Sequence, residues 1–131
     1  MRTDLAGWLV AVLVGLGPAL GAEPPAELRP QQRKELEDRS KALNQRAWEL
    51  YQRGQYAPAT DLLRQALAMR QKLYPRERYP QGHPLLAQSL NSLGSLLQAQ
   101  GEYASAEPLV RDAVQMYQSQ LQSTGKVTRP A

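Results

Sequence analysis

The sequence contains an internal repeat, in which one stretch of the chain recurs 47 residues further on. Residues 43–74 align with residues 90–121, and 12 of the 32 aligned pairs are identical. The identical pairs include Gly54/Gly101, Tyr56/Tyr103, Ala59/Ala106 and Ala66/Ala113. A repeat of this length is one supersecondary unit that buries its apolar face against the next copy. We therefore expect two similar units placed side by side.

Each copy has the apolar spacing of two helices joined by a turn. In the second copy, Leu90, Leu93 and Leu97 recur three and four residues apart, which places them on one face of a helix. Gly94 lies within this stripe, and we expect a neighbouring helix to approach closely there. Apolar residues return at the same spacing after a turn at residues 100–102, so the unit is a helical hairpin. The sequence predicts an all-α fold of two hairpins, which is a short α-solenoid.

Proline and glycine residues mark the boundaries between segments. Pro24, Pro25 and Pro30 predict an extended linker, because each proline disfavours helix in the residue before it. A second group of prolines predicts a loop over residues 74–83. The predicted order is a signal peptide over residues 1–22, a Pro-rich linker over 23–30, a helical repeat domain over 31–122 with hairpins at about 41–74 and 84–121, and a disordered tail over 123–131.

Residues 1–22 have the layout of a secretory signal peptide. Arg2 precedes an apolar run over residues 5–16, and Ala19 and Gly21 are the small residues required for a cut after Gly21. A cut one residue later is the alternative. We therefore expect an exported protein, periplasmic or secreted. A retained membrane anchor and an unprocessed cytoplasmic protein are the rival interpretations, but the apolar run is too short for a stable span, which needs about 20 residues.

Residue types that carry catalysis or bind metals are scarce. The chain has no cysteine, which excludes thiol catalysis and Cys-based zinc sites, and its one histidine, His83, lacks co-ligands. We interpret His83 as a turn residue at a His-Pro helix entry. The adjacent acids Glu35, Glu37 and Asp38 are expected on a solvated helix face. No catalytic residue, metal site or cofactor is predicted, so we do not expect an enzyme.

The charge pattern argues against a nucleic-acid partner. The net charge is +4, yet basic and acidic residues are interleaved from Arg33 to Asp112 without a run of four basic residues. A solvated helical surface has this mixture, whereas a nucleic-acid site concentrates basic side chains on one face.

The residues around the turns resemble the tetratricopeptide repeat. Gly101, Tyr103 and Ala106 follow its Gly-x-Tyr-x-x-Ala pattern, and Ala113 is the alanine expected seven residues later. The equivalent residues of the first copy follow the same pattern. The resemblance implies helical hairpins that stack on one another.

A longer subtype of this repeat, the kinesin-light-chain type, resembles the chain more closely. Residues 83–93 and 106–109 follow its His-Pro-x-x-Ala-x-Ser-Leu-Asn-x-Leu and Ala-Glu-Pro-Leu patterns. Such repeats are similar to those of long bacterial repeat proteins. The departures are a longer period, with the extra residues in the loop over 74–83, and Arg46 at a position that is usually apolar.

The resemblance implies a concave groove in which an asparagine on the first helix of each hairpin contacts a bound peptide. Asn44 and Asn91 hold that position, and an amide offers a donor and an acceptor to one peptide unit. Bridging between adjacent helices is their alternative role. The candidate groove residues are Lys41, Asn44, Trp48, Tyr51, Asn91, Ser95 and Gln98, with Gln52 and Gln88 on the same face. This groove is polar and mildly basic, which favours a peptide with acidic character. Tyr56 and Tyr103, which follow the turns, are expected in the core.

The last helix has more apolar residues than its own hairpin can bury. The candidate association surface consists of Leu109, Val110, Val114, Tyr117 and Leu121, with Met116 nearby. Because repeat arrays need polar ends, we expect this surface to self-associate into a homo-oligomer or to dock onto another helical protein. The sequence thus predicts a non-catalytic interaction module that binds a peptide or protein. The alternative is an N-terminal piece of a larger repeat protein with little function alone.

Overall fold

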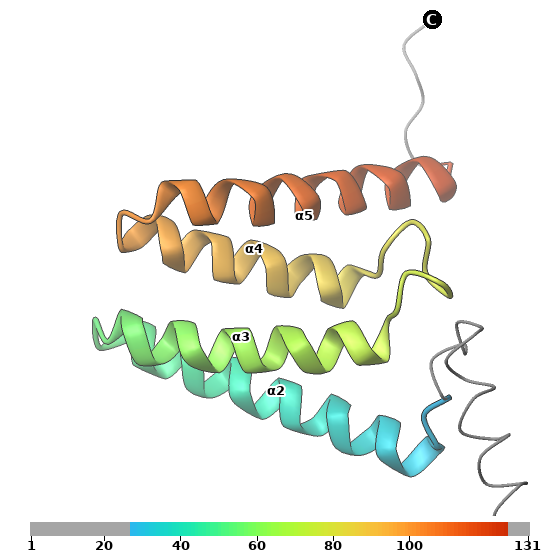
Figure 1. Ribbon diagram of the computed structural model, residues 1–131, viewed down its shortest axis with the longest axis horizontal. Helices are drawn as coiled ribbons and strands as arrows, with labels where there is room; N and C mark the ends of the chain where they lie inside the picture. The colour runs from blue at the N-terminus through green and yellow to red at the C-terminus, as the bar shows by residue number, and fades with distance from the viewer. Residues whose placement is uncertain (1–26, 126–131) are drawn as a thin grey trace, which may run out of the picture.

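The computed structural model describes residues 27–125, and this part of the chain forms four α-helices and no β-strand. The helices are α2 (Pro30–Gln52), α3 (Tyr56–Leu73), α4 (Pro84–Ala99) and α5 (Tyr103–Ser123). They lie in chain order, with α2 against α3, α3 against α4, and α4 against α5 (Figure 1). The prediction of two helical hairpins is confirmed. The predicted signal peptide over residues 1–22 lies outside the described residues.

Both hairpin turns end the first helix in the same way. Gly54 and Gly101 have φ angles of +74° and +81°, a left-handed conformation that glycine adopts without steric cost. In each turn the glycine N–H and the next N–H bond back to the last turn of the helix at 2.9 Å, for example Gly101 N to Gln98 O and Glu102 N to Leu97 O. This pair of bonds is a Schellman motif. The repeated glycine therefore gives the two hairpins the same turn geometry.

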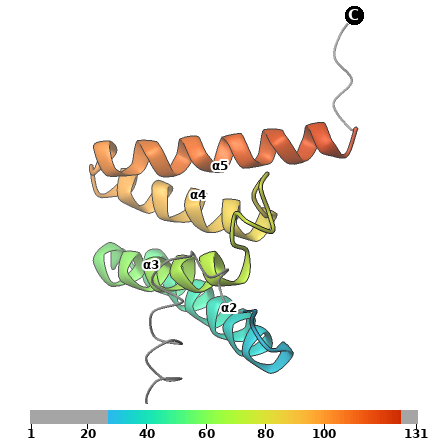
Figure 2. The same ribbon diagram turned by 45° about the vertical axis from the view of Figure 1, so that its right-hand side comes forward.

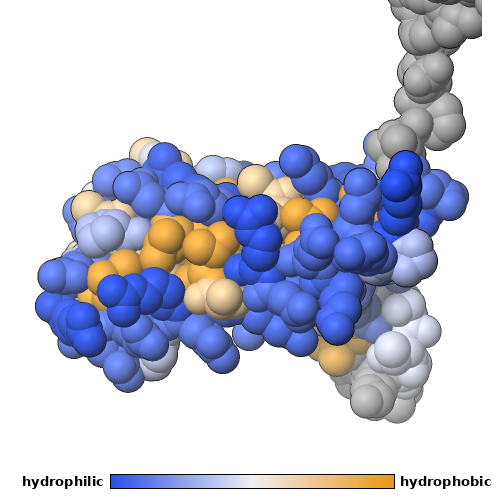
Figure 3. Space-filling view, turned by 90° about the horizontal axis from the view of Figure 1, so that it is seen from below, coloured by the Kyte–Doolittle hydropathy of each residue, from blue (hydrophilic) through white to orange (hydrophobic). Residues whose placement is uncertain are grey.

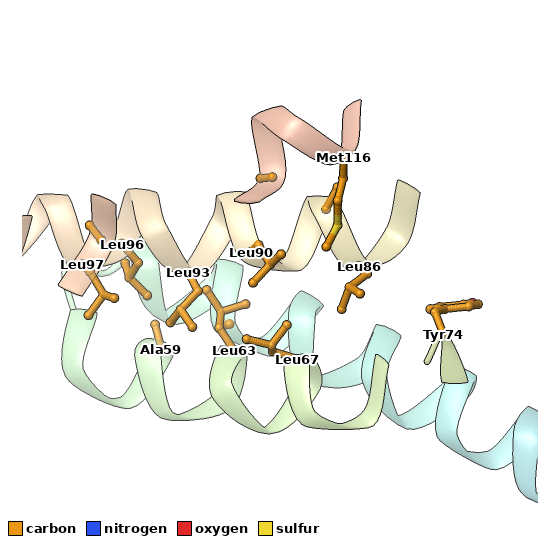
Figure 4. Packing of buried hydrophobic residues seen from close by; sticks show 14 of the residues in the cluster. Ala59, Leu63, Leu67, Tyr74, Leu86, Leu90, Leu93, Leu96, Leu97 and Met116 are labelled. Atoms are coloured by element: carbon orange, nitrogen blue, oxygen red, sulfur yellow. The ribbon is translucent and has the colours of Figure 1, made fainter. Parts of the chain in front are cut away.

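The core lies between the helices and uses small residues where they cross. The repeated alanines Ala59, Ala66, Ala106 and Ala113 are each at most 1% exposed. Between the hairpins, Leu63 and Leu67 of α3 point toward Leu90 and Leu93 of α4 (Figure 4). Met116 of α5 points toward Leu86 of α4 in the same view. The two repeats thus share one continuous core.

Helices α4 and α5 approach each other closely at Gly94. A Cβ atom built on Gly94 would lie 2.5 Å from Val110 Cγ2 and 3.4 Å from Ala106 O. Carbon atoms in contact are normally about 3.5–4.0 Å apart, so only glycine fits without movement. The expected close approach at Gly94 is confirmed.

The beginning of α2 diverges from the rest of the stack (Figure 2). Pro30 starts the helix, and Gln32 Oε1 accepts a hydrogen bond from Arg29 N at 3.0 Å. Leu36 packs against the core although it is only partly buried, and Ser40 is buried as well. The first half of α2 therefore covers one end of the repeat stack with few apolar contacts. Helix α2 begins at Pro30, one residue before the predicted start of the helical repeat domain at residue 31, and its polar first half precedes the hairpin predicted from about residue 41.

The loop between the hairpins is held by three aromatic rings. The rings of Tyr74 and His83 stack with their centroids 3.6 Å apart, and Tyr79 meets both rings edge-on. His83 Nδ1 accepts a hydrogen bond from Leu85 N at 3.1 Å, so His83 is the N-cap of α4. Burial, together with the nearby Arg70 cation and against the opposing effect of Glu37, lowers the pKa of His83. The neutral ring is the form that can accept this bond.

Two expectations near the second turn and the chain end need adjustment. The prediction that Tyr103 is in the core is wrong, because its side chain is 67% exposed. Tyr56, the equivalent residue of the first repeat, is half-buried, and its ring lies 5.4 Å from the ring of Tyr51. In the second repeat the position of Tyr51 is occupied by Gln98, so Tyr103 has no corresponding aromatic neighbour. Helix α5 continues to Ser123, one residue beyond the predicted domain end, and residues 126–131 of the predicted tail lie outside the described chain.

Candidate functional site

A cleft of about 500 Å³ lies between α2 and α4, with α3 contributing to its floor. Its lining combines polar side chains from the two first helices with a few apolar ones. The lining residues are Lys41, Asn44, Gln45, Ala47, Trp48 and Tyr51 of α2, Leu63 and Arg70 of α3, and Gln88, Asn91, Ser92, Ser95 and Leu96 of α4. A volume of this size is within the range of pockets that bind molecules much larger than a single small ion.

Most of the predicted groove residues lie in this cleft. Lys41, Asn44, Trp48, Tyr51, Asn91 and Ser95 line it, and so does Gln88. Gln98 and Gln52 do not, since they lie in the last turns of α4 and α2 beyond its end. Sequence reasoning missed Gln45, Arg70 and Ser92 and the apolar floor. Gln45 and Ser92 follow the two asparagines directly, so a wider helical stripe would have included them.

The two asparagines occupy equivalent places on α2 and α4, 47 residues apart. Asn44 is half-buried and its Nδ2 donates to Ser40 O at 2.9 Å within the same helix. This bond uses one N–H of the amide, and among residues 27–125 its Oδ1 has no partner. Asn91 is exposed. The two helices thus present similar amides to the cleft, and neither amide bridges the helices.

Aromatic rings form one part of the cleft wall. Trp48 is 59% exposed, and its ring stacks on Tyr51 with centroids 5.3 Å apart and an interplanar angle of 17°. Large exposed rings that are held in place offer an apolar surface at low entropic cost. On the face seen from the α2 side, a band of apolar side chains lies between polar ones (Figure 3).

Arg70 is the buried cation of the cleft, and its side chain is held by α4. Only 5% of the residue is exposed. Its Nη1 donates to Leu85 O at 2.8 Å and to Ser89 Oγ at 2.7 Å, and lies 3.4 Å from Gln88 Oε1. Burial lowers the pKa of Arg70, with Tyr74 opposing the shift. The signal that could have found it is a charged residue within the apolar stripe of α3.

The charge of the cleft is positive. Lys41 and Arg70 are its charged lining residues, and no acidic side chain is among the residues that line it. A bound group of negative charge would meet two cations there without a competing carboxylate from the wall.

The predicted association surface is partly exposed. Val114 (47%), Tyr117 (37%) and Leu121 (46%) are exposed, whereas Leu109 and Val110 are half-buried and Met116 is buried. The first repeat shows the environment of the side chains at the equivalent positions. The equivalent residues of the first repeat are Leu67 and Arg70 of α3 and Tyr74, which follows α3 directly, and all three are buried.

Two structural findings bear on other classes of function. Within residues 27–125, no helix combines the length and apolar character needed to cross a bilayer. The same part of the chain holds no cluster of three or more His, Asp or Glu side chains that could bind a metal ion.

A comparison with known protein families matches both hairpins to one repeat family. The sequence profile described as Tetratricopeptide repeat matches residues 40–84 and 86–119, which together make up more than half of the 131 residues. The chain belongs to the tetratricopeptide repeat family. Its repeats are of the kinesin-light-chain-like type, as the residues around the turns indicated. Among curated proteins, no match to the chain is found.

The first tetratricopeptide match includes the loop over residues 74–83 and ends at Pro84, where α4 begins. Repeats of this family are non-catalytic modules that generally mediate protein–protein interactions. Membership in the family therefore indicates protein partners.

Proposed function

We propose that this tetratricopeptide repeat protein binds an extended peptide, or an extended segment of a partner protein, in the cleft between α2 and α4. The observation that carries the proposal is that one cleft collects Asn44 and Asn91 from equivalent positions of the two repeats. Two amides in register can each pair with one peptide unit of an extended chain, which supplies affinity independent of side-chain sequence.

The other walls of the cleft set the preference among peptides. The stacked rings of Trp48 and Tyr51 offer an apolar surface, and large aromatic side chains often dominate binding energy. Lys41 and Arg70 make the site positive, so we expect the bound peptides to carry acidic residues.

Selection of short random peptides against the immobilised full chain tests this function. Trp48→Ala and Asn91→Ala should weaken binding of the selected peptides at least about tenfold, which corresponds to about 1.4 kcal/mol. Glu35→Ala is the matched control, because Glu35 is an exposed α2 residue outside the cleft. Failure to select any peptide, or equal affinity for all four proteins, would contradict the proposal.

Export is part of the proposed function. The apolar run over residues 5–16 and the small residues before Ala22 support it. The intact mass of protein recovered from the native host should correspond to a chain that begins at Ala22 or Glu23. Recovery of the full chain with Met1 from a soluble cytoplasmic fraction would contradict export.

A second candidate function, self-association through α5, is favoured by the exposure of Val114, Tyr117 and Leu121. Burying such side chains contributes about 1.5–3 kcal/mol each, which favours a covered state. Sedimentation over a concentration series should show reversible dimers for the wild type and monomers for Val114→Glu. Gln118→Glu, also exposed on α5, should leave the dimer intact. A wild-type chain that stays monomeric throughout the series would exclude this function.

A further inference from the structure

One side of α5 carries a continuous stripe of mostly apolar residues. Its members follow one another by four and three residues in alternation, which is the spacing of the contact line between two paired helices. We call this stripe the α5 seam, and it consists of Tyr103, Glu107, Val110, Val114, Tyr117 and Leu121. Val110 is half-buried and the other five residues are exposed. The seam therefore runs along almost the whole helix and includes the exposed ring of Tyr103.

The opposite end of the stack presents charge where the repeat has apolar residues. Helices α2 and α5 lie at the two ends of the stack (Figure 1). Leu86 and Leu93 of α4 are buried, whereas the equivalent residues of α2, 47 positions earlier, are the exposed Arg39 and Arg46. Arg46 Nη1 donates a hydrogen bond to Glu49 Oε2 at 2.8 Å on this face. A second copy that continued the stack by placing α2 on α5 would remove these charges from water, which is costly. The end at α2 therefore opposes head-to-tail stacking.

The spacing of the α5 seam is the same in both chain directions. A second copy in the antiparallel direction therefore places one seam residue opposite each seam residue of the first. The opposed pairs are Tyr103 with Leu121, Glu107 with Tyr117, and Val110 with Val114, each occurring twice. Such a contact uses the same surface on both copies, so it closes at two copies.

Glu107 distinguishes the antiparallel direction from the parallel one. It is the one charged residue of the α5 seam, and its carboxylate accepts a hydrogen bond from Arg111 of its own helix. In a parallel pair, Glu107 would lie opposite Glu107 of the second copy, and the two like charges would repel. In an antiparallel pair it lies opposite Tyr117, whose hydroxyl group can donate a hydrogen bond to the carboxylate.

We propose that two copies of this chain pair through the α5 seam, with their α5 helices antiparallel, and form a closed dimer. This arrangement rests on the self-association through α5 proposed above, and it specifies the partner and its direction. At about 1.5 Å per residue, the 21 residues of α5 extend over about 31 Å. A contact along one helix is small beside a standard interface of about 1,600 Å², so the dimer should dissociate reversibly on dilution.

Disulfide trapping tests the direction of the helices, because the chain has no cysteine of its own. Tyr103→Cys and Leu121→Cys change exposed residues at opposite ends of the α5 seam, so we expect both full-length variants to fold. An oxidised equimolar mixture should give mainly the mixed disulfide dimer. Each variant alone should form little disulfide, since the antiparallel arrangement holds its two cysteines about 27 Å apart along the helix axis. Efficient trapping of each variant with itself would show a parallel pair and overturn the proposal.

A second mixture tests head-to-tail stacking. Arg46→Cys and Val114→Cys would meet if α2 of one copy continued the stack from α5 of another, and our arrangement keeps them apart. No mixed disulfide should form. A trapped product from this mixture, or sedimenting species larger than a dimer, would overturn the closed arrangement.

Tyr117→Phe tests the predicted contact with Glu107. Loss of the hydroxyl group should raise the dissociation constant of the dimer at least about fivefold in sedimentation experiments. The same change should have no such effect in a Glu107→Ala background, because the acceptor is already absent. Equal effects in the two backgrounds would overturn the pairing of these residues.

These measurements separate the arrangement from the self-association on which it rests. If the wild type dimerises but the trapped product is parallel or head-to-tail, the antiparallel arrangement fails and self-association through α5 stands. If the wild type stays monomeric across the concentration series, both fail. Peptide selection against the cleft is read out separately in either case.

Discussion

Gly94→Ala tests the close packing of α4 against α5. The added Cβ would lie 2.5 Å from Val110 Cγ2, about 1 Å inside normal carbon–carbon contact. Val110 is β-branched and has one strongly preferred rotamer in a helix, so its methyl group cannot rotate away cheaply. Overpacking of this kind costs about 1–3 kcal/mol. Alanine in place of a helical glycine returns about 0.8–1.0 kcal/mol. The expected net change is a loss of about 1 kcal/mol in the free energy of unfolding.

Removing the obstructing methyl group should reverse the sign of this effect. In a Val110→Ala background, Gly94→Ala meets no Cγ2 atom and should stabilise the chain by about 1 kcal/mol through helix propensity. The coupling energy between the two sites is then about 2 kcal/mol, within the range for residues in direct contact. Urea unfolding of the four proteins, followed by circular dichroism, measures it.

The first repeat supplies the control for this cycle. The residues equivalent to Gly94 and Val110 are Ala47 and Leu63. The first hairpin therefore already holds a Cβ atom at this position, and Ala47 is only 2% exposed. Ala47→Gly should therefore destabilise by at least about 1 kcal/mol. If Gly94→Ala stabilises the wild type as much as it stabilises Val110→Ala, the coupling is zero and the argument from close approach is refuted.

Three further predictions concern stability. Ala106 is fully buried, so Ala106→Leu should lower the free energy of unfolding by about 1–3 kcal/mol. The control Glu35→Ala, at an exposed position, should change it by less than about 0.5 kcal/mol. Equal melting temperatures for the two variants would contradict the packing assignment. Gly101→Ala meets no atom within 4 Å but keeps a φ of +81°, so thermal unfolding should show a backbone cost of about 1–2 kcal/mol, and an unchanged melting temperature would argue against the left-handed turn. Because the pKa of His83 is lowered below 6.5, the unfolded chain binds the proton more readily, and the free energy of unfolding should fall as the pH drops through and below 6.5. His83→Asn keeps an acceptor at the N-cap and should reduce this slope in urea titrations at several pH values, which an unchanged slope would disprove.

Local signals in the sequence were sufficient to place the helices. Gly54 and Gly101 end α2 and α4 because a left-handed residue closes the last turn, and this depends only on neighbouring residues. Pro84 starts α4 for a similarly local reason, since the first N–H groups of a helix have no partner within it. Because the sequence repeats these signals, both hairpins were predicted to have the same helix–turn–helix structure.

The candidate cleft was predicted from the resemblance to the tetratricopeptide repeat, which implied a groove along the first helices with Asn44 and Asn91 in it. Helical spacing then placed other residues, such as Lys41, on the same face, and Lys41, Asn44 and Asn91 all line the cleft. The length of the cleft could not be assigned in this way. Gln98 follows Ser95 by three residues but does not line the cleft, because it lies in the last turn of α4.

The environment of individual side chains was decided by tertiary structure. Tyr56 and Tyr103 have the same place in the repeat, yet only Tyr56 is partly buried, because Tyr51 lies beside it and the second repeat has Gln98 there. Arg70 lies in an apolar stripe of α3 and becomes a buried cation because α4 covers it and Leu85 and Ser89 accept its hydrogen bonds. The sequence by itself determined the helices, their order and the faces they share, since these depend on residues close together along the chain. Only the packing of one helix on the next decided which charges and rings are enclosed, since burial depends on residues that are distant in the sequence.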